Sequence, residues 1–266
     1  MTIYEFKNKL ISEIIKNPKV LAIGQTGDLN APLMPGQSDI DMFALCSEIP
    51  TQEERKQMYE PLSKEYSECM MAVCNGGIWG YGDILFFEEI DVMPMFFTEK
   101  EMQEYLEQTL RGEHLYKDGR FYPVGRLASI ESLNVLFERN GEWTKQINRV
   151  KKHPKELFDK MYQFQIDSVL DEEDLGRAVL RKEVLFYHQV MEEALDHLLQ
   201  ALFALNNTYF PSRKRMQQYI EKFEIKPQDC YSRLLAIVEE SVHEETIEQS
   251  VMHLRQLTEE VKSLSR

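Results

Sequence analysis

The chain has 266 residues, of which 43% are hydrophobic and 29% charged, a composition typical of a folded globular protein rather than a disordered one. Its 45 acidic and 31 basic residues give a formal net charge of -14, which repels polyanions and disfavours a general nucleic-acid binder. The same charge slightly favours a cationic small molecule as a partner.

The amino terminus, from Met1 to Pro18, mixes charges into an amphipathic pattern and lacks the apolar core of a secretory signal. No stretch approaches the roughly 18 consecutive apolar residues that a membrane span needs, so we expect a cytoplasmic protein without a membrane partner. Four cysteines without Cys-x-x-Cys spacing and six scattered histidines predict reduced thiols and no zinc site. A bound metal is therefore expected to have oxygen ligands.

Helix and strand patterns alternate over about the first hundred residues. Apolar residues recur at steps of three and four from Ile3 to Ile14, which predicts an opening helix that ends near Pro18. The apolar run 20–23 predicts a strand closed by Gly24, and a loop follows as far as Gln37. A further helix is expected over 52–66, with strands over 40–45, 70–74, 84–87 and 90–97.

The pattern becomes mostly helical from Glu99 onward, with turn signals between the helices. The longest apolar stripes lie in 184–203 and 247–264, and each is expected to be the buried face of a helix. The last stripe suits packing within the chain or against a second copy, so a monomer and a homodimer both remain open. The sequence thus predicts an α+β fold, with a small mixed sheet in residues 1–110 and an all-α helical bundle in residues 111–266.

Two aspartates flank Ile40 at the start of the strand expected over 40–45. Because side chains alternate along a strand, Asp39 and Asp41 lie on the same face, roughly 7 Å apart. Mg²⁺ prefers oxygen ligands and commonly combines one or two carboxylates with substrate phosphates. An Asp-x-Asp pair at a strand edge is by itself more often a solvated turn, but the preceding glycine-containing loop and the following apolar run favour a metal-nucleotide platform.

The segment from Gly24 to Met42 resembles the nucleotidyltransferase superfamily of DNA polymerase β type, including the antibiotic adenylyltransferases with a helical carboxy-terminal domain. A glycine turn stands about a dozen residues before Ser-Asp-Ile-Asp, as in that family. The family has a third acidic residue on a later strand, a position that Asp91 supplies. The resemblance implies that Asp39, Asp41 and Asp91 are catalytic and hold metal, and that Asp91 orients or deprotonates an acceptor hydroxyl.

The loop before the aspartates is expected to meet the nucleotide phosphates through Thr26, Gly27 and Ser38. Its register against the family remains open. If Gly27 is the family glycine, Asp28 replaces the usual hydroxyl, and a carboxylate there would repel a triphosphate. If Gly24 is the family glycine, Thr26 keeps the hydroxyl but the loop is longer.

A basic triplet at 213–215 is the other candidate for binding phosphate. It follows Asn206–Ser212, which is similar to an Asn-x-x-Tyr-Phe-Pro stretch in the helical domains of related transferases. By that resemblance Lys214 contacts the nucleotide. Pro211 and Ser212 are also helix-start signals, so a solvated first turn explains the triplet equally well.

These features predict nucleotidyl transfer with ATP as the substrate. AMP is expected to move to a hydroxyl of a small-molecule acceptor, with Mg²⁺ or Mn²⁺ required and pyrophosphate released. The acceptor would bind between the two domains, and its identity is left open.

Two other functions remain open. A catalytically inactive nucleotide-binding or interaction protein would keep the same fold, and the irregular loop at Asp28 favours it. Arg181 and His188 resemble the Arg-x(4–6)-His signature of helical ribonucleases. His188 lies near an apolar stripe, however, where a hydrogen-bonded core histidine is more common than a catalytic one.

Overall fold

The chain folds into two compact units in a computed structural model that describes residues 1–119 and 121–265. The first unit comprises Met1–Gln108 and Ser129–Lys152, and the second comprises Thr109–Ala128 and His153–Arg266. The division expected at residue 110 lies near the first passage between the units. The chain then returns to the first unit to add one more strand and one more helix.

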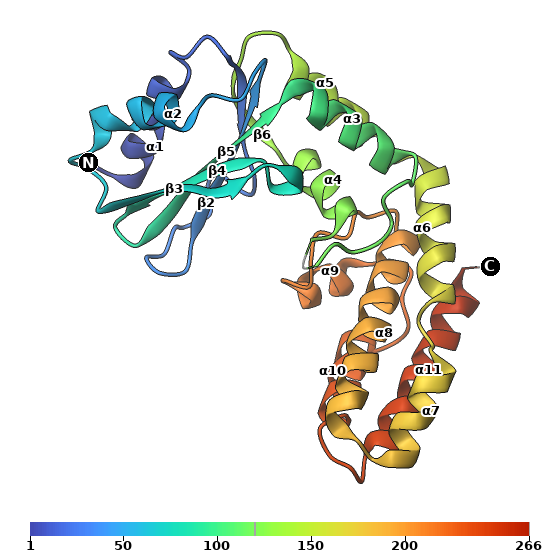
Figure 1. Cartoon of the computed structure of the whole chain (residues 1–266). Helices are drawn as coiled ribbons and strands as arrows, with labels where there is room; N and C mark the ends of the chain where they lie inside the picture. The colour runs from blue at the N-terminus through green and yellow to red at the C-terminus, as the bar shows by residue number, and fades with distance from the viewer. Residues whose placement is uncertain (120, 266) are drawn as a thin grey trace. The chain divides into compact units, whose positions relative to one another are not determined.

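A six-stranded sheet forms the centre of the first unit, in the order β3-β4-β5-β2-β1-β6 (Figure 1). Strands β2 and β5 pair in parallel, and the other neighbouring pairs are antiparallel, so the sheet is mixed as predicted. The strands are β1 (Val20–Gln25), β2 (Asp39–Cys46), β3 (Glu68–Asn75), β4 (Tyr81–Phe87), β5 (Ile90–Thr98) and β6 (Asn134–Glu138).

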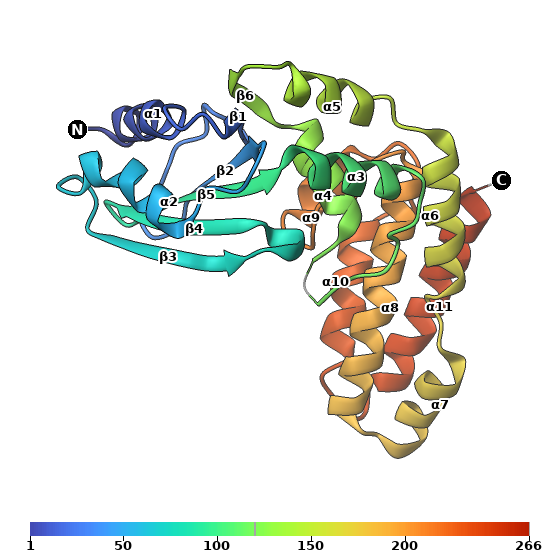
Figure 2. The ribbon, with the colours of Figure 1, turned by 45° about the horizontal axis from the view of Figure 1, so that its top comes forward.

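Helices α1 (Ile3–Ile14) and α2 (Gln52–Tyr59) lie side by side and cover one face of this sheet (Figure 2). Each begins with a capping box, in which the side chain of Thr2 or Thr51 accepts a hydrogen bond from the backbone of a glutamate three residues later. The helix expected over 52–66 is shorter than predicted: a 3-10 turn containing Pro61 follows α2 and ends at Leu62.

The core under these helices contains the even-numbered side chains of β2, among them Ile40 and Met42, each 1% exposed. Alternation along the strand therefore turns Asp39 and Asp41 to the opposite face. Further along that face, Phe43 packs edge-on against Phe97 of β5, with ring centroids 5.6 Å apart.

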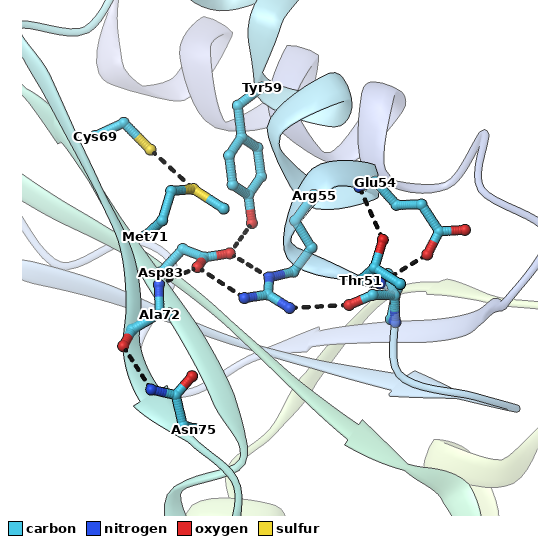
Figure 3. A network of polar contacts seen from close by, with 10 residues as sticks. Thr51, Glu54, Arg55, Tyr59, Cys69, Met71, Ala72, Asn75 and Asp83 are labelled. Carbon is cyan, nitrogen blue, oxygen red and sulfur yellow. Dashed lines mark hydrogen bonds and ion pairs between the residues drawn. The ribbon is translucent and has the colours of Figure 1, made fainter.

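A buried ion pair fixes the edge of the sheet beside α2 (Figure 3). The Asp83 carboxylate on β4 is fully buried and accepts hydrogen bonds from Arg55 Nε at 2.7 Å, from Tyr59 OH at 2.8 Å and from the backbone N–H of Ala72 at 2.7 Å. Ala72 has a φ of 56° within the irregular part of β3, where its register against β4 shifts. The carboxylate thus holds a β-bulge in place as well as neutralising Arg55.

Strand β6 was not predicted, because the sequence beyond Glu99 was expected to be mostly helical. Residues 134–138 pair antiparallel with β1, with Gln25 opposite Asn134 and Gly24 opposite Val135. Leu133, just before β6, packs directly over Gly24: a Cβ added at Gly24 would lie 2.4 Å from Leu133 Cδ2, so the Leu133 side chain would have to move. Helix α5 (Glu142–Val150) follows, and its Trp143 donates a hydrogen bond to the Phe43 carbonyl at 3.2 Å.

The elements that the structure describes wholly within the second unit are helices, in agreement with the predicted helical bundle. The long helix α8 packs against α6, α7 and α11, and the stripe predicted over 184–203 is its buried face. None of the described helices is long and apolar enough to cross a membrane. The remaining helices are α3 (Glu99–Leu110), α4 (Pro123–Glu131), α6 (Lys155–Asp167), α7 (Glu172–Arg181), α8 (Val184–Leu205), α9 (Met216–Lys222), α10 (Cys230–Glu240) and α11 (Ile247–Leu264).

Candidate active site

Three aspartates lie on one face of the sheet where β2 and β5 begin. The parallel register places Asp39 directly opposite Asp91, and Asp41 opposite Met93. Register partners on neighbouring strands share a face, and the strands are about 4.8 Å apart. Asp39 is exposed, while Asp41 and Asp91 are half-buried. The sheet thus places on one face the three acids that the sequence proposed as one group, and their catalytic role stays a prediction.

A tight turn between β4 and β5 positions Asp91. Glu88 and Glu89 link Phe87 to Ile90 and both have positive φ, 48° and 60°. Asparagine and glycine are the residues that such a two-residue turn normally prefers, so two glutamates there carry backbone strain. Gly36 in the loop before β2 donates its N–H to the Glu89 carbonyl at 2.7 Å. The loop and the turn therefore hold each other beside the carboxylates.

The loop between β1 and β2 contains the residues expected to meet phosphate. Thr26 donates its backbone N–H to the Asp41 carbonyl at 3.1 Å, which ties the start of the loop to the second aspartate. Gly27 is exposed and has a φ of 80°, the conformation of a turn glycine. The Ser38 hydroxyl accepts a hydrogen bond from the Met34 N–H at 2.8 Å and so closes the far end of the loop.

The structure distinguishes the two glycines of the open register. Gly24 lies inside β1 against Leu133, whereas Gly27 forms the turn. Asp28, next to that turn, accepts the Asn30 N–H with Oδ1 at 2.9 Å. Its carboxylate is exposed and shapes the loop locally.

Asn134 binds the loop between β1 and β2, a role that the sequence did not indicate. Its Nδ2 donates to the Gly27 carbonyl at 2.7 Å and lies 3.4 Å from the Gln25 carbonyl. The amide side chain fixes the turn from the unpredicted strand β6. The short run Asn-Val-Leu-Phe-Glu carries weak strand character, but five residues among helical patterns give little signal.

The donor chemistry of this face fits a magnesium ion that is completed by a substrate. No group of three or more His, Cys, Asp or Glu side chains converges tightly enough to hold a metal alone within residues 1–119 and 121–265. Mg²⁺ does not need such a cage, because it usually takes one or two carboxylates together with phosphate oxygens and waters. The carboxylates of Asp39 and Asp41 are hard oxygen donors of that kind, and Asp91 lies opposite Asp39.

Lys214, the other predicted phosphate ligand, belongs to the helical unit. Its side chain is exposed, and its backbone N–H donates to the Ser212 hydroxyl at 3.2 Å. Its neighbour Arg213 is bound to Asp196 of α8. The role of Lys214 therefore stays a prediction.

The proposed ribonuclease residues lie on two different helices of the second unit. Arg181, at the end of α7, is exposed and lies 3.8 Å from the Glu183 carboxylate. His188, on α8, is half-buried, and its Nε2 lies 3.2 Å from the hydroxyl of the fully buried Ser241. Ser241 in turn donates to the Val238 carbonyl at 2.5 Å. This chain of hydrogen bonds is typical of a structural histidine between packed helices.

Comparison with known proteins gives matches in family and in structure. A family model described as "Domain of unknown function (DUF4037)" matches residues 121–216. No curated protein matches the chain with significance. Among solved structures, the chain is similar to a nucleotidyltransferase-like protein from Exiguobacterium sibiricum 255-15, with 14% identity and a TM-score of 0.50, over 99% of this chain and 77% of that one.

A second solved structure is spectinomycin adenyltransferase AAD(9) from Enterococcus faecialis, determined with ATP and spectinomycin. The identity is 14% and the TM-score 0.36, over 99% of this chain and 98% of that one. The similarity to the first protein, together with the mixed sheet described above, shows that this chain has a nucleotidyltransferase-like fold followed by helices.

Proposed function

We propose that the protein is a nucleotidyltransferase that moves AMP from ATP to a hydroxyl group of a small-molecule acceptor, with Mg²⁺ or Mn²⁺ required. The observation that carries the proposal is the parallel register of β2 and β5, which sets Asp91 opposite Asp39 on the face that also bears Asp41. A solvated turn would not need these acids on paired strands with a buried reverse face.

The proposed reaction is an in-line displacement at the α-phosphorus of ATP. The acceptor hydroxyl oxygen forms a bond to that phosphorus, the bond to the β-phosphate oxygen breaks, and pyrophosphate leaves. Asp91 takes the hydroxyl proton. Asp39 and Asp41 would hold the divalent ion, which neutralises phosphate charge and stabilises the entering and leaving oxygens when bound.

The loop is proposed to bind the phosphates mainly through its backbone and hydroxyl groups. Thr26 and Gly27 stand at the turn that Asn134 fixes, and Ser38 immediately precedes the first aspartate. Asp28 beside the turn adds negative charge, so the metal ion would have to compensate for it. A cationic acceptor is favoured because the chain carries a net charge of -14.

Pyrophosphate release with ATP, Mg²⁺ and a panel of hydroxyl-bearing acceptors tests the proposal. Asp39→Asn and Asp41→Asn are each expected to reduce the rate by at least about a hundredfold, since they remove charge that the transition state requires. Asp167→Asn, an exposed change on α6 with the same loss of charge, serves as the matched control and should keep the wild-type rate.

ATP binding measured by calorimetry separates the possible outcomes. Binding of Mg-ATP that weakens in Asp39→Asn, together with acceptor-dependent pyrophosphate release, supports the transferase. Binding without release for any acceptor would favour a catalytically inactive nucleotide-binding protein. The absence of ATP binding to the wild-type chain would defeat both.

A further inference from the structure

A buried carboxylate in the helical unit holds two cations at the protein surface. Asp196 on α8 is 3% exposed, and it accepts hydrogen bonds from Lys117 Nζ, from Arg213 Nε and from Tyr122 OH, the last at 2.7 Å. The side chains of Lys117 and Arg213 are 32% and 37% exposed. The carboxylate is sealed, but both of its cations reach solvent.

The cations outnumber the acid that holds them. Burial raises the pKa of Asp196, but the hydrogen bonds from Lys117, Tyr122 and Arg213 outweigh that effect and leave the pKa below its usual value. The group is thus an ionised carboxylate between two positive charges. The next residues along the chain, Lys214 and Arg215, are exposed, and within the described chain neither forms an ion pair. Lys214 and Arg215 thus add two exposed positive charges to the segment that carries Arg213.

The donors of the two held cations are only partly used. Arg213 directs Nε to Asp196 and Nη2 to the Glu192 carbonyl, and none of the described residues accepts a hydrogen bond from its Nη1. Lys117 gives one of its three N–H groups to the same carboxylate. Because the carboxylate already fixes both side chains, an anion that binds them has less side-chain entropy to lose.

We propose that Lys117 and Arg213, positioned by Asp196, form a binding site for a polyphosphate anion. A guanidinium presents a planar fork that matches phosphate oxygens, and an ammonium is a compact partner for a second phosphate. A chain of phosphates supplies both groups at once, whereas a single carboxylate does not. The site lies within the helical unit and does not depend on the proposed transfer reaction.

Metal-free calorimetry with inorganic tripolyphosphate on the full chain tests the site. We expect saturable binding that weakens by about tenfold or more in Arg213→Gln, because a charge-assisted hydrogen bond is lost. Arg215→Gln is the matched control: it removes the same charge two positions further along the chain, and Arg215 has no ion-pair partner in the described chain. This change should alter the affinity by less than about threefold.

Asp196→Asn gives the sharpest result, because charge and positioning predict opposite changes. Removing a negative charge would by itself strengthen anion binding, whereas loss of the group that holds Lys117 and Arg213 should weaken it. Weaker binding by a variant that keeps its helical circular dichroism supports the site. Equal or tighter binding, or equal losses in Arg213→Gln and Arg215→Gln, would overturn it.

Two further arms separate this site from its alternatives. ATP without metal should bind about as tightly as tripolyphosphate. If ATP binds and tripolyphosphate does not, recognition of the phosphate chain is refuted. The double variant Asp39→Asn with Asp41→Asn should keep tripolyphosphate binding even if it is inactive in transfer. A loss of that binding in the double variant would contradict a site in the helical unit.

Discussion

In each unit a buried aspartate binds an arginine and a tyrosine, and the two arrangements differ in how exposed the arginine is to solvent. In the first unit Asp83 is 0% exposed and its partner Arg55 is 3% exposed. In the helical unit Asp196 is 5% exposed at its side chain, but Arg213 is 37% exposed. The carboxylates are alike and the cations are not.

This difference separates a structural role from a binding role. Arg55 is enclosed, and it also donates to the Pro50 carbonyl at 2.9 Å, so its guanidinium binds only groups inside the protein. Arg213 directs part of its guanidinium outward. An ion pair whose cation is sealed can only stabilise the fold, whereas one whose cation is open can also bind a ligand.

The largest expected effect is on the sealed pair. Asp83→Asn should lower the free energy of unfolding of the first unit by about 3–5 kcal/mol, because it leaves the buried Arg55 without its counter-charge. Both tryptophans, Trp79 and Trp143, belong to this unit, so urea unfolding followed by tryptophan fluorescence reports it selectively. A loss below about 1 kcal/mol would show that Arg55 finds another way to be solvated.

The open pair is expected to matter less for stability. Asp196→Asn should cost roughly 1–3 kcal/mol, because it weakens charge-assisted hydrogen bonds while Arg213 and Lys117 can turn to water. The loss should appear in the helical circular dichroism transition and leave the tryptophan transition in place. A shift of both transitions by the same amount would mean that the two units unfold together.

Acid should remove the contribution of Asp196 selectively. Its pKa is lowered in the folded protein from an ordinary value of 3.8, so its stabilisation is complete above that value and is lost as the pH falls through the folded pKa. The stability difference between wild type and Asp196→Asn should therefore be constant near about pH 6 and should shrink below about pH 3.8. Urea titrations at both ends of this range measure it, and a difference that grows in acid would contradict the assignment.

The smallest effect is expected at an exposed ion pair between a lysine and an aspartate. Lys155 and Asp159 on α6 are 2.6 Å apart, with side chains 81% and 60% exposed. Lys155→Gln should change the free energy of unfolding by less than about 0.5 kcal/mol, because solvent screens the pair. A larger loss would show that exposure does not set the ranking of these ion pairs.

The candidate site shows which features a local sequence pattern can predict and which it cannot. Alternation along one strand was enough to predict that Asp39 and Asp41 share a face, and the strand is where it was expected. That Asp91 stands opposite Asp39 follows from the parallel register of two distant segments, which no local pattern specifies. Only the family resemblance indicates Asp91 from the sequence.

What the sequence determined by itself were the elements with a long internal repeat. The helix from Ile3 to Ile14, the long helix α8 and the final helix α11 each show three- and four-residue steps over several turns, and all three formed as predicted. Their hydrogen bonds are internal, so their pattern is readable along the chain.

Only the tertiary structure decided the elements and groups whose partners are remote. Strand β6 is five residues long and takes its backbone hydrogen bonds from β1, more than a hundred residues earlier, so its own sequence could not reveal it. In the same way, Asp196 becomes a buried hub because Lys117 and Arg213 arrive from separate segments. Charges and strands that depend on remote partners are set by packing, because their energy lies in contacts between distant parts of the chain.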